Sequence, residues 1–264
     1  MSINNDDLNL ALFCDFENVA LGVRDAKYPK FDIRLVLEHL LLKGSLVVKK
    51  AYCDWERYKE FKAVMHEASF ELIEIPHTRQ SGKNSADIRM VVDALDLCYT
   101  KEHIDTFVII SGDSDFSPLV SKLRENAKVV IGVGVKNSTS DLLMNNCDEF
   151  IFYDDLIRKA APRKTSKASK SKKANASTPD DKLDEAINLV METAEALYAD
   201  QGHGQKLWGS MVKQTLKRRR PGFNERFYGV RSFGDLLEEA ENRGLLKLEL
   251  DERSGGYVIK GLGG

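Results

Sequence analysis

The chain has 264 residues, of which 42% are hydrophobic, and its formal net charge is -2. This composition is sufficient for packed cores, and it excludes a largely disordered protein. The first ten residues lack a basic segment followed by an apolar one, the apolar runs are too short to span a bilayer, and four widely spaced cysteines form no CxxC pattern. We therefore expect a cytoplasmic protein with reduced thiols, without a signal peptide or a membrane segment.

The near-neutral total hides three segments of different charge. Residues 1–155 hold 26 acidic and 18 basic residues, a net charge of -8. Residues 156–179 hold eight basic and no acidic residues, whereas 180–264 hold 15 acidic and 13 basic residues. We predict an N-terminal domain, a basic disordered linker and a C-terminal domain, with the ranges 1–157, 158–179 and 180–264.

Short apolar runs alternate with helical patterns in the N-terminal domain, which is typical of an α/β fold with a parallel sheet flanked by helices. The predicted strands are residues 10–15, 46–52, 70–75, 107–111, 129–133 and 149–153. The predicted helices are the segment between Asp32 as N-cap and Gly44, then about 56–68, 85–99 and 115–126.

Four aspartates are predicted to meet at the carboxyl ends of these strands. Asp15, Asp113 and Asp115 follow strands, and Asp87 opens a helix after a polar loop. In open parallel sheets, active crevices lie at this edge. Several carboxylates that lie close together repel one another unless a cation lies between them, so we predict a Mg²⁺ or Mn²⁺ site. Each aspartate alone also fits a helix-capping role.

Asp93 lies six residues after Asp87 on the same predicted helix. That separation is about 9 Å of rise and roughly 240° of rotation, so the two carboxylates need not share a face. We predict a supporting role for Asp93; the alternative is a salt-bridged helix residue.

Three sequence blocks resemble the NYN domain, a PIN-like nuclease fold: DFEN at 15–18, NSADIRMVVDALD at 84–96 and SGDSDFSPLV at 111–120. The resemblance covers about residues 8–155. It implies a metal-dependent ribonuclease in which Asp15, Asp87 and Asp113 bind metal and Asp115 assists. Asn18 and Ser111 match polar positions around the metal site.

The expected chemistry is hydrolysis of a phosphodiester bond by a metal-activated water. Arg79 and Lys83 flank Asp87 and are candidates for phosphate contact, and Arg24 and Lys27 are weaker candidates. The GDSD motif is also similar to that of haloacid dehalogenase-like phosphatases. Their second aspartate after the first strand is here Glu17, which counts against that class.

The C-terminal domain is predicted to contain helices over about 180–199, 205–217 and 231–242, followed by a hairpin across residues 251–256. Three helices and a two-stranded wing describe a winged helix-turn-helix domain. Residues 206–231 carry eight bases and one acid, so this part is predicted to face an anion. The candidate RNA-binding residues are Lys213, Lys217, Arg218, Arg219, Arg220, Arg226, Arg231 and Tyr228.

The segment 218–240 resembles the LOTUS domain, also called OST-HTH, through Pro221, Phe223, Tyr228 and the Phe233 region. That family implies binding of RNA in some members and recruitment of protein partners in others. The basic residues favour RNA, and the linker would add affinity for any polyanion. The sequence therefore predicts a cytoplasmic ribonuclease; the competing class is a non-catalytic RNA-binding or scaffold protein.

Overall fold

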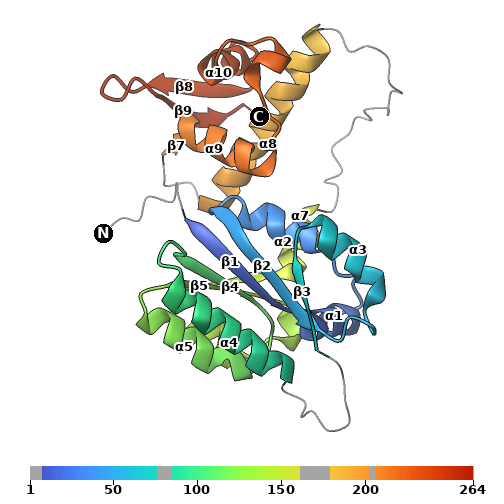
Figure 1. Ribbon diagram of the computed structural model, residues 1–264. Helices are drawn as coiled ribbons and strands as arrows, with labels where there is room; N and C mark the ends of the chain where they lie inside the picture. The colour runs from blue at the N-terminus through green and yellow to red at the C-terminus, as the bar shows by residue number, and fades with distance from the viewer. Residues whose placement is uncertain (1–7, 76–84, 161–178, 202–205, 264) are drawn as a thin grey trace. The chain divides into compact units, whose positions relative to one another are not determined.

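The computed structural model describes residues 8–75, 85–160, 179–201 and 206–263. The chain divides into two compact units, residues 1–163 and 164–264 (Figure 1). None of the helices within these described ranges has both the length and the apolar character needed to cross a membrane.

The N-terminal unit is built on a sheet of six strands in the order β3-β2-β1-β4-β5-β6, and every neighbouring pair is parallel. The predicted α/β class and parallel sheet are confirmed. The strands are β1 Asn9–Asp15, β2 Ser45–Cys53, β3 Glu71–Glu74, β4 Thr106–Ile110, β5 Val129–Gly134 and β6 Glu149–Phe152. Because the chain builds outward in opposite directions from β1 and β4, the topological switch point lies between these two strands.

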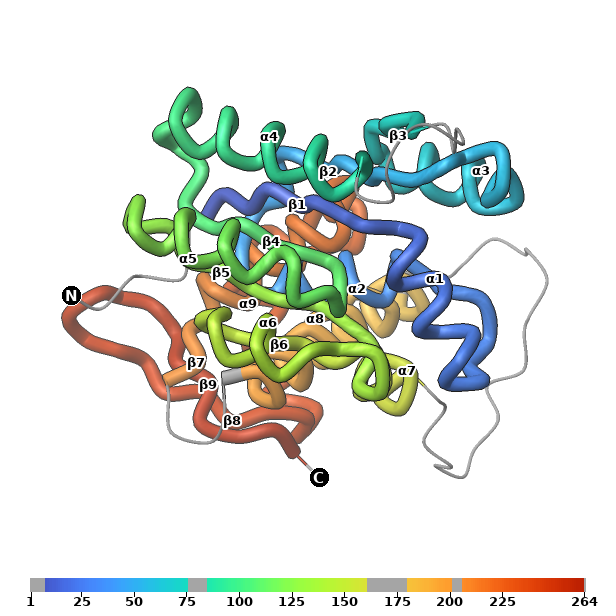
Figure 2. The backbone as a smooth tube through the Cα atoms, turned by 90° about the horizontal axis from the view of Figure 1, so that it is seen from below, coloured from blue at the N-terminus to red at the C-terminus, as the bar shows by residue number. Residues whose placement is uncertain are grey.

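Helices cover both faces of this sheet, as the two views in Figures 1 and 2 show. One layer contains α1 Phe16–Asp25, α2 Ile33–Leu40, α3 Lys59–Glu67 and α7 Tyr153–Ala160. The other contains α4 Ser85–Thr100, α5 Ser117–Glu125 and α6 Asp141–Asn146. In β1, Leu12 and Cys14 face the first layer and Ala11 and Phe13 face the second, which is the alternation expected of a buried strand.

Three short helices were not predicted from the sequence: α1, α6 and α7. The α7 helix also continues through residues 158–160, which the sequence analysis assigned to the linker. Its sequence explains this, because Asp154 and Asp155 lie in its first turn and Arg158 and Lys159 in its last, where each charge favours the helix dipole. The rest of the linker, up to residue 178, lies outside the described residues.

The C-terminal unit contains three α-helices and a three-stranded antiparallel sheet of order β7-β9-β8. Its elements are α8 Pro179–Gln201, β7 Leu207–Trp208, α9 Gly209–Arg219, the 3-10 turn η4 Glu225–Tyr228, α10 Phe233–Asn242, β8 Leu246–Leu250 and β9 Tyr257–Leu262. The expected hairpin is present. The third strand, β7, was predicted as the start of a helix, because two residues are too few to show an alternating pattern.

Candidate functional site

The candidate site lies where β1 and β4 end side by side. These strands pair in parallel with Cys14 opposite Ile110, so the next residues, Asp15 and Ser111, are neighbours at the carboxyl edge of the sheet. The Ser111 hydroxyl donates a hydrogen bond to Asp15 Oδ2 at 3.0 Å, and both residues are buried. The central pair of strands therefore holds one carboxylate at the switch point.

Further hydrogen bonds join the turns that follow these strands. The Asn18 backbone N–H donates to Asp15 Oδ1 at 3.3 Å, and the Gly112 N–H donates to the Asn18 side-chain oxygen at 2.9 Å. The Asp113 N–H donates to Ser111 Oγ at 3.2 Å. Asn18 and Ser111 thus link the start of α1 to the end of β4.

The capping role considered for the aspartates is present for two of them. Asp15 caps α1, and Asp113 caps the 3-10 turn η2 Ser114–Phe116 by accepting from the Asp115 N–H at 3.0 Å. Asp115 itself is exposed. Capping leaves further lone pairs on each carboxylate, so it is compatible with a role in binding a cation.

The aspartates interact electrostatically across the site. Burial raises the pKa of Asp15 to about 7, and the charges of Asp87 and Asp113 add to the shift, although hydrogen bonds from Asn18 and Ser111 oppose it. Burial also raises the pKa of Asp87, and the charges of Asp113, Asp115 and Glu17 contribute. The sheet edge and the start of α4 therefore concentrate negative charge that a bound cation would relieve.

These carboxylates do not yet form a coordination set. Among the described residues, no group of three or more His, Cys, Asp and Glu side chains is arranged to hold a metal ion. Carboxylate and hydroxyl oxygens are nevertheless the donors that Mg²⁺ and Mn²⁺ prefer, so the donor chemistry fits. The four aspartates are brought into electrostatic range, and their role as metal ligands stays a prediction.

Asp93 faces the sheet. Its carboxylate accepts hydrogen bonds from the Tyr52 hydroxyl at 2.9 Å and from Arg89 Nε at 3.0 Å, and Lys50 Nζ lies 3.4 Å away. These contacts tie α4 to β2 and thereby fix the helix that carries Asp87. Asp93 is therefore a salt-bridged helix residue, as the alternative prediction stated. Any support that it gives to the site would act by fixing the position of α4.

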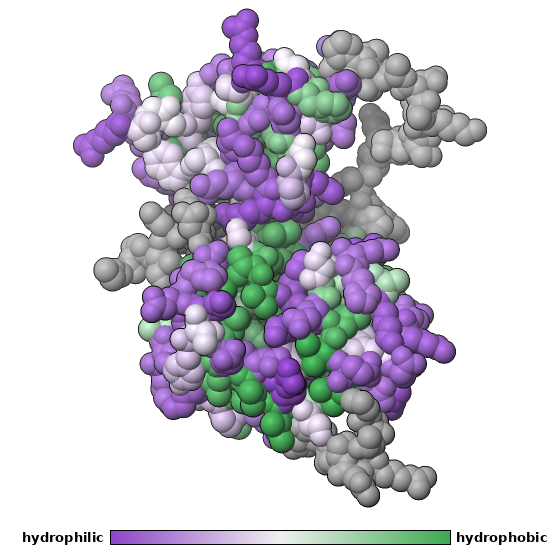
Figure 3. All heavy atoms as spheres, viewed as in Figure 1, coloured by the Kyte–Doolittle hydropathy of each residue, from purple (hydrophilic) through white to green (hydrophobic). Residues whose placement is uncertain are grey.

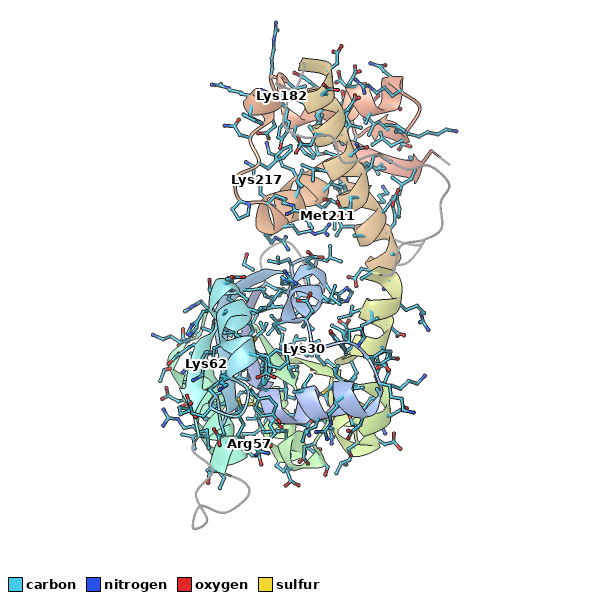
Figure 4. All side chains as sticks on the ribbon, turned by 90° about the vertical axis from the view of Figure 1, so that its right-hand side faces the viewer. Lys30, Arg57, Lys62, Lys182, Met211 and Lys217 are labelled. Carbon is cyan, nitrogen blue, oxygen red and sulfur yellow. The ribbon has the colours of Figure 1, made fainter. Side chains whose placement is uncertain are left out.

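Sequence reasoning missed Glu17 and Arg57 as neighbours of the site. Arg57 Nη1 lies 3.1 Å from Glu17 Oε1, and Glu17 acts on the pKa of Asp87. In Figure 4, Arg57 lies at the lower end of the N-terminal unit, the end toward which β1 and β2 run in Figure 1. The position of Glu17 in the DFEN block could have indicated it, whereas a pair 40 residues apart gives no sequence signal.

The predicted phosphate contacts near the site are only partly described. Arg79 and Lys83 lie outside the described residues. Arg24 is exposed and pairs with Asp25 at 3.2 Å. Lys27 lies two residues after the end of α1 and has a left-handed backbone conformation with a φ of 60°.

The turns at the site are packed tightly against the loop after β5. A Cβ atom on Gly112 would lie 2.3 Å from the Ser138 backbone oxygen, and one on Gly22 would lie 2.4 Å from the Ser138 hydroxyl. The Ser140 N–H also donates to the Gly112 carbonyl at 2.9 Å. Glycine is therefore required at position 112 by close approach to backbone, and residues 138–140 help to hold the turn that carries Asp113.

A groove of about 700 Å³ lies beside the acidic residues. Asp87 and Asp115 line one part of it, and apolar side chains of α4, α5 and α6 line the rest together with three serines. Its residues are Asp87, Ile88, Val91, Val92, Ser114, Asp115, Ser117, Pro118, Ser121 and Leu142. The site is therefore open on the side of α4.

In the C-terminal unit, the candidate basic residues divide by exposure. Lys217, Arg220, Arg226 and Arg231 are exposed. The side chain of Arg219 is only 14% exposed and pairs with Glu192 of α8 at 3.0 Å, so its contacts are structural. The remaining two, Lys213 and Arg218, are partly buried, and Lys213 Nζ lies 3.1 Å from Glu225.

The aromatic residues of this segment also differ in exposure. Phe223 is buried and stacks on the half-buried Tyr228, with ring centroids 5.3 Å apart. Phe227 is 62% exposed, and Lys182 Nζ lies 4.7 Å from its ring centroid. Phe227 is therefore more accessible than Tyr228 for stacking on a nucleobase. The sequence did not distinguish these two neighbouring residues, because both lie among the same basic residues.

The sequence profile of the NYN domain matches residues 9–154, more than half of the chain. The chain belongs to the NYN domain family. NYN domains are PIN-like nucleases, a class that generally uses divalent metals, so membership indicates a nuclease-type, RNA-related function. The match begins with β1 and ends in α7, and it includes every aspartate of the candidate site.

Two relatives extend this comparison. An uncharacterized protein of Methanocaldococcus jannaschii is 29% identical over 121 residues, which are 46% of this chain and 47% of the relative, so the match spans about half of that protein. The crystal structure of a protein of unknown function from Vibrio parahaemolyticus aligns with a TM-score of 0.51 and 26% identity, covering 59% of this chain and 98% of that one. A fold similar to part of this chain thus makes up nearly the whole of that protein.

Proposed function

We propose that the protein is a metal-dependent ribonuclease that hydrolyses RNA phosphodiester bonds. The observation that carries the proposal is the electrostatic coupling of Asp15, Asp87, Asp113 and Asp115 at the switch point of an NYN domain. Burial raises the pKa values of Asp15 and Asp87 and the neighbouring carboxylates add to the shift, a combination that marks functional sites more often than random surface positions. The haloacid dehalogenase-like alternative has no support from family membership.

In this proposal Asp15, Asp87 and Asp113 hold Mg²⁺ or Mn²⁺, and Asp115 assists. The cation would activate water and neutralise charge on the phosphate. Ser111 and Asn18 orient Asp15 through their hydrogen bonds, and Asp93 positions Asp87 by anchoring α4. Glu17 acts on Asp87 and forms an ion pair with Arg57, and in this proposal Arg57 also contacts the phosphate.

The test is cleavage of labelled single-stranded, duplex and structured RNAs, with matched DNAs, in Mn²⁺, Mg²⁺ or a chelator. We expect cleavage of RNA that requires the metal and is lost in Asp113→Asn, while RNA binding is kept. Cleavage by Asp113→Asn at the wild-type rate, or in the presence of the chelator, would refute the assignment.

A non-catalytic RNA-binding or scaffold protein is the second candidate. The observation that favours it is that no ligand set is preassembled among the described carboxylates. Isothermal titration with Mn²⁺ separates the two: binding that disappears in Asp15→Asn and Asp87→Asn supports the nuclease, and an absence of binding in the wild type supports the scaffold.

We further propose that the C-terminal unit is a winged helix-turn-helix domain of the LOTUS type that binds RNA. Its three helices, its β8–β9 hairpin and the exposed Lys217, Arg220, Arg226 and Arg231 support this role. Removal of residues 160–264 should weaken RNA binding and reduce its dependence on salt, because fewer counterions are released. An equal affinity and salt slope after truncation would exclude RNA binding by this unit and leave recruitment of a protein partner as its role.

A further inference from the structure

The outer face of α4 carries an apolar stripe that no other described residues of the N-terminal unit cover. Ile88, Val92 and Tyr99 are 63%, 55% and 61% exposed, and Leu95 between them is partly buried. The spacing of four, three and four residues places all four side chains along one side of the helix. This is the pattern of a helix that packs against a second helix.

The stripe continues into neighbouring apolar surface. Pro118 and Leu142 lie across the groove from α4, and Leu142 is 58% exposed. Hydrophobic residues reach the surface of the N-terminal unit in the face drawn in Figure 3. Contiguous exposed apolar surface of this kind marks a docking site more often than isolated exposed residues do.

The extent of the stripe favours a helix over a nucleobase as its occupant. From Ile88 to Tyr99 it runs about 16 Å, the rise of eleven residues, and it leads away from the carboxylate at Asp87. A stacked base would occupy only one part of that length. A second amphipathic helix would cover all of it.

The charged residues beside the stripe could pair with the same residues of a second copy of the chain. Arg89 and Asp96 are both exposed, lie on the same flank of α4 and are seven residues, two helical turns, apart. Among the described residues, Asp96 forms no ion pair and Arg89 pairs with Asp93 alone. Asp93 would keep Lys50 and Tyr52 as partners if Arg89 turned away from it. A twofold axis across the middle of α4 would bring each Arg89 toward Asp96 of the other copy.

We propose that this face binds a second copy of the chain, with the two α4 helices packed antiparallel about a twofold axis. Ile88 then packs against Tyr99 of the other copy, and Val92 packs against Leu95. Two Arg89–Asp96 pairs lie along one side of this apolar seam. Because Ile88 follows Asp87, the interface borders both candidate sites and aligns them on one dimer. The proposal does not depend on the nuclease activity.

The first test is sedimentation velocity of the full chain over a concentration range of about 1–100 µM, where interfaces of modest area dissociate. Wild type should show a monomer–dimer equilibrium, and Val92→Glu should weaken it at least tenfold. Leu250→Glu is the matched control, because Leu250 is also apolar and 56% exposed but lies in the other unit. A wild type that stays monomeric, or a Val92→Glu variant that dimerises as wild type does, would overturn the proposal.

A charge exchange tests the antiparallel geometry. Arg89→Glu and Asp96→Arg should each weaken the dimer because each places like charges opposite one another, and the double variant should restore it. Circular dichroism checks that each variant is folded. If the double variant dimerises no more strongly than either single variant, the Arg89–Asp96 pairing is rejected. A Val92→Glu variant with unchanged sedimentation but weaker binding of single-stranded RNA would assign the groove to RNA instead.

Discussion

The two units of the chain arrange their charged residues in opposite ways. In the N-terminal unit, Asp15, Asp87 and Asp113 come from β1, α4 and the turn after β4, and they meet only because the sheet places those elements together. In the C-terminal unit, the exposed basic residues proposed to bind RNA all come from the single segment 206–231. The first arrangement can define a precise geometry at one point, and the second can provide a charged surface that tolerates many substrates.

This contrast predicts different sensitivity to mutation. A site assembled from distant elements depends on each hydrogen bond between its turns. A surface formed by separate exposed basic side chains loses affinity in small steps, roughly one phosphate contact at a time.

The largest expected effect is that of Asp87→Asn on RNA cleavage. The change removes a charge that acts directly in the carboxylate cluster, so the loss should exceed the factor of about 100 typical of residues behind a metal ligand. Single-turnover cleavage with Mn²⁺ measures it. Asp93→Asn on the same helix is the control, which should lower the melting temperature but leave more cleavage activity than Asp87→Asn does. A larger loss of activity in Asp93→Asn than in Asp87→Asn would contradict the roles given to the two residues.

Gly112→Ala should destabilise the N-terminal unit by about 1–3 kcal/mol, the cost typical of overpacking. The reason is the 2.3 Å approach of the new Cβ to the Ser138 backbone oxygen. Urea unfolding monitored by circular dichroism measures the change. Gly222→Ala is the matched control because no atom lies within 4 Å of its Cβ position. Equal stability of the two variants would contradict the role of residue 138 in holding the turn.

Phe227→Ala should weaken RNA binding by about 5- to 150-fold if its ring stacks on a nucleobase, since such stacking contributes about 1–3 kcal/mol. The salt dependence of binding should stay unchanged because no charge is removed. Fluorescence anisotropy at several salt concentrations tests both points. Lys217→Ala should do the opposite, with a small loss of affinity and a smaller salt slope; a Phe227→Ala variant with wild-type affinity would leave the exposed ring without a role in RNA binding.

Asp15→Asn should raise the free energy of unfolding at pH 8 without metal by about 1–2 kcal/mol, the smallest effect. The folded-state pKa of Asp15 is raised from 3.8 to about 7. Its protonated form therefore stabilises the fold below about pH 3.8, and this stability is lost as the pH rises through 7. Thermal melts of the two proteins from pH 4 to 8 should differ most at pH 8 and draw together as the pH falls toward 4, and added Mn²⁺ should stabilise wild type only. Equal melting curves at pH 8 would refute this effect.

The sequence predicted the sheet and the four aspartates because their signals are local. Leu10 to Asp15 is an uninterrupted buried strand, and Asp15 follows it directly. The α1 and α7 helices were missed because each begins at the residue after a strand ends, at Phe16 and Tyr153, so no loop residues mark the boundary. The Glu17–Arg57 and Arg219–Glu192 pairs join residues that are 40 and 27 positions apart. Only the tertiary structure shows that these two arginines are already ion-paired.

The contact between Gly112 and Ser138 has a consequence for any attempt to move this site to another scaffold. Grafting the aspartates, Ser111 and Asn18 onto a different sheet would reproduce every polar side chain around the site. It would omit the loop after β5, whose backbone oxygen lies so close to Gly112 that it fixes the path of the turn before Asp113. A transplant would have to include residues 135–140, a segment whose side chains carry none of the proposed chemistry.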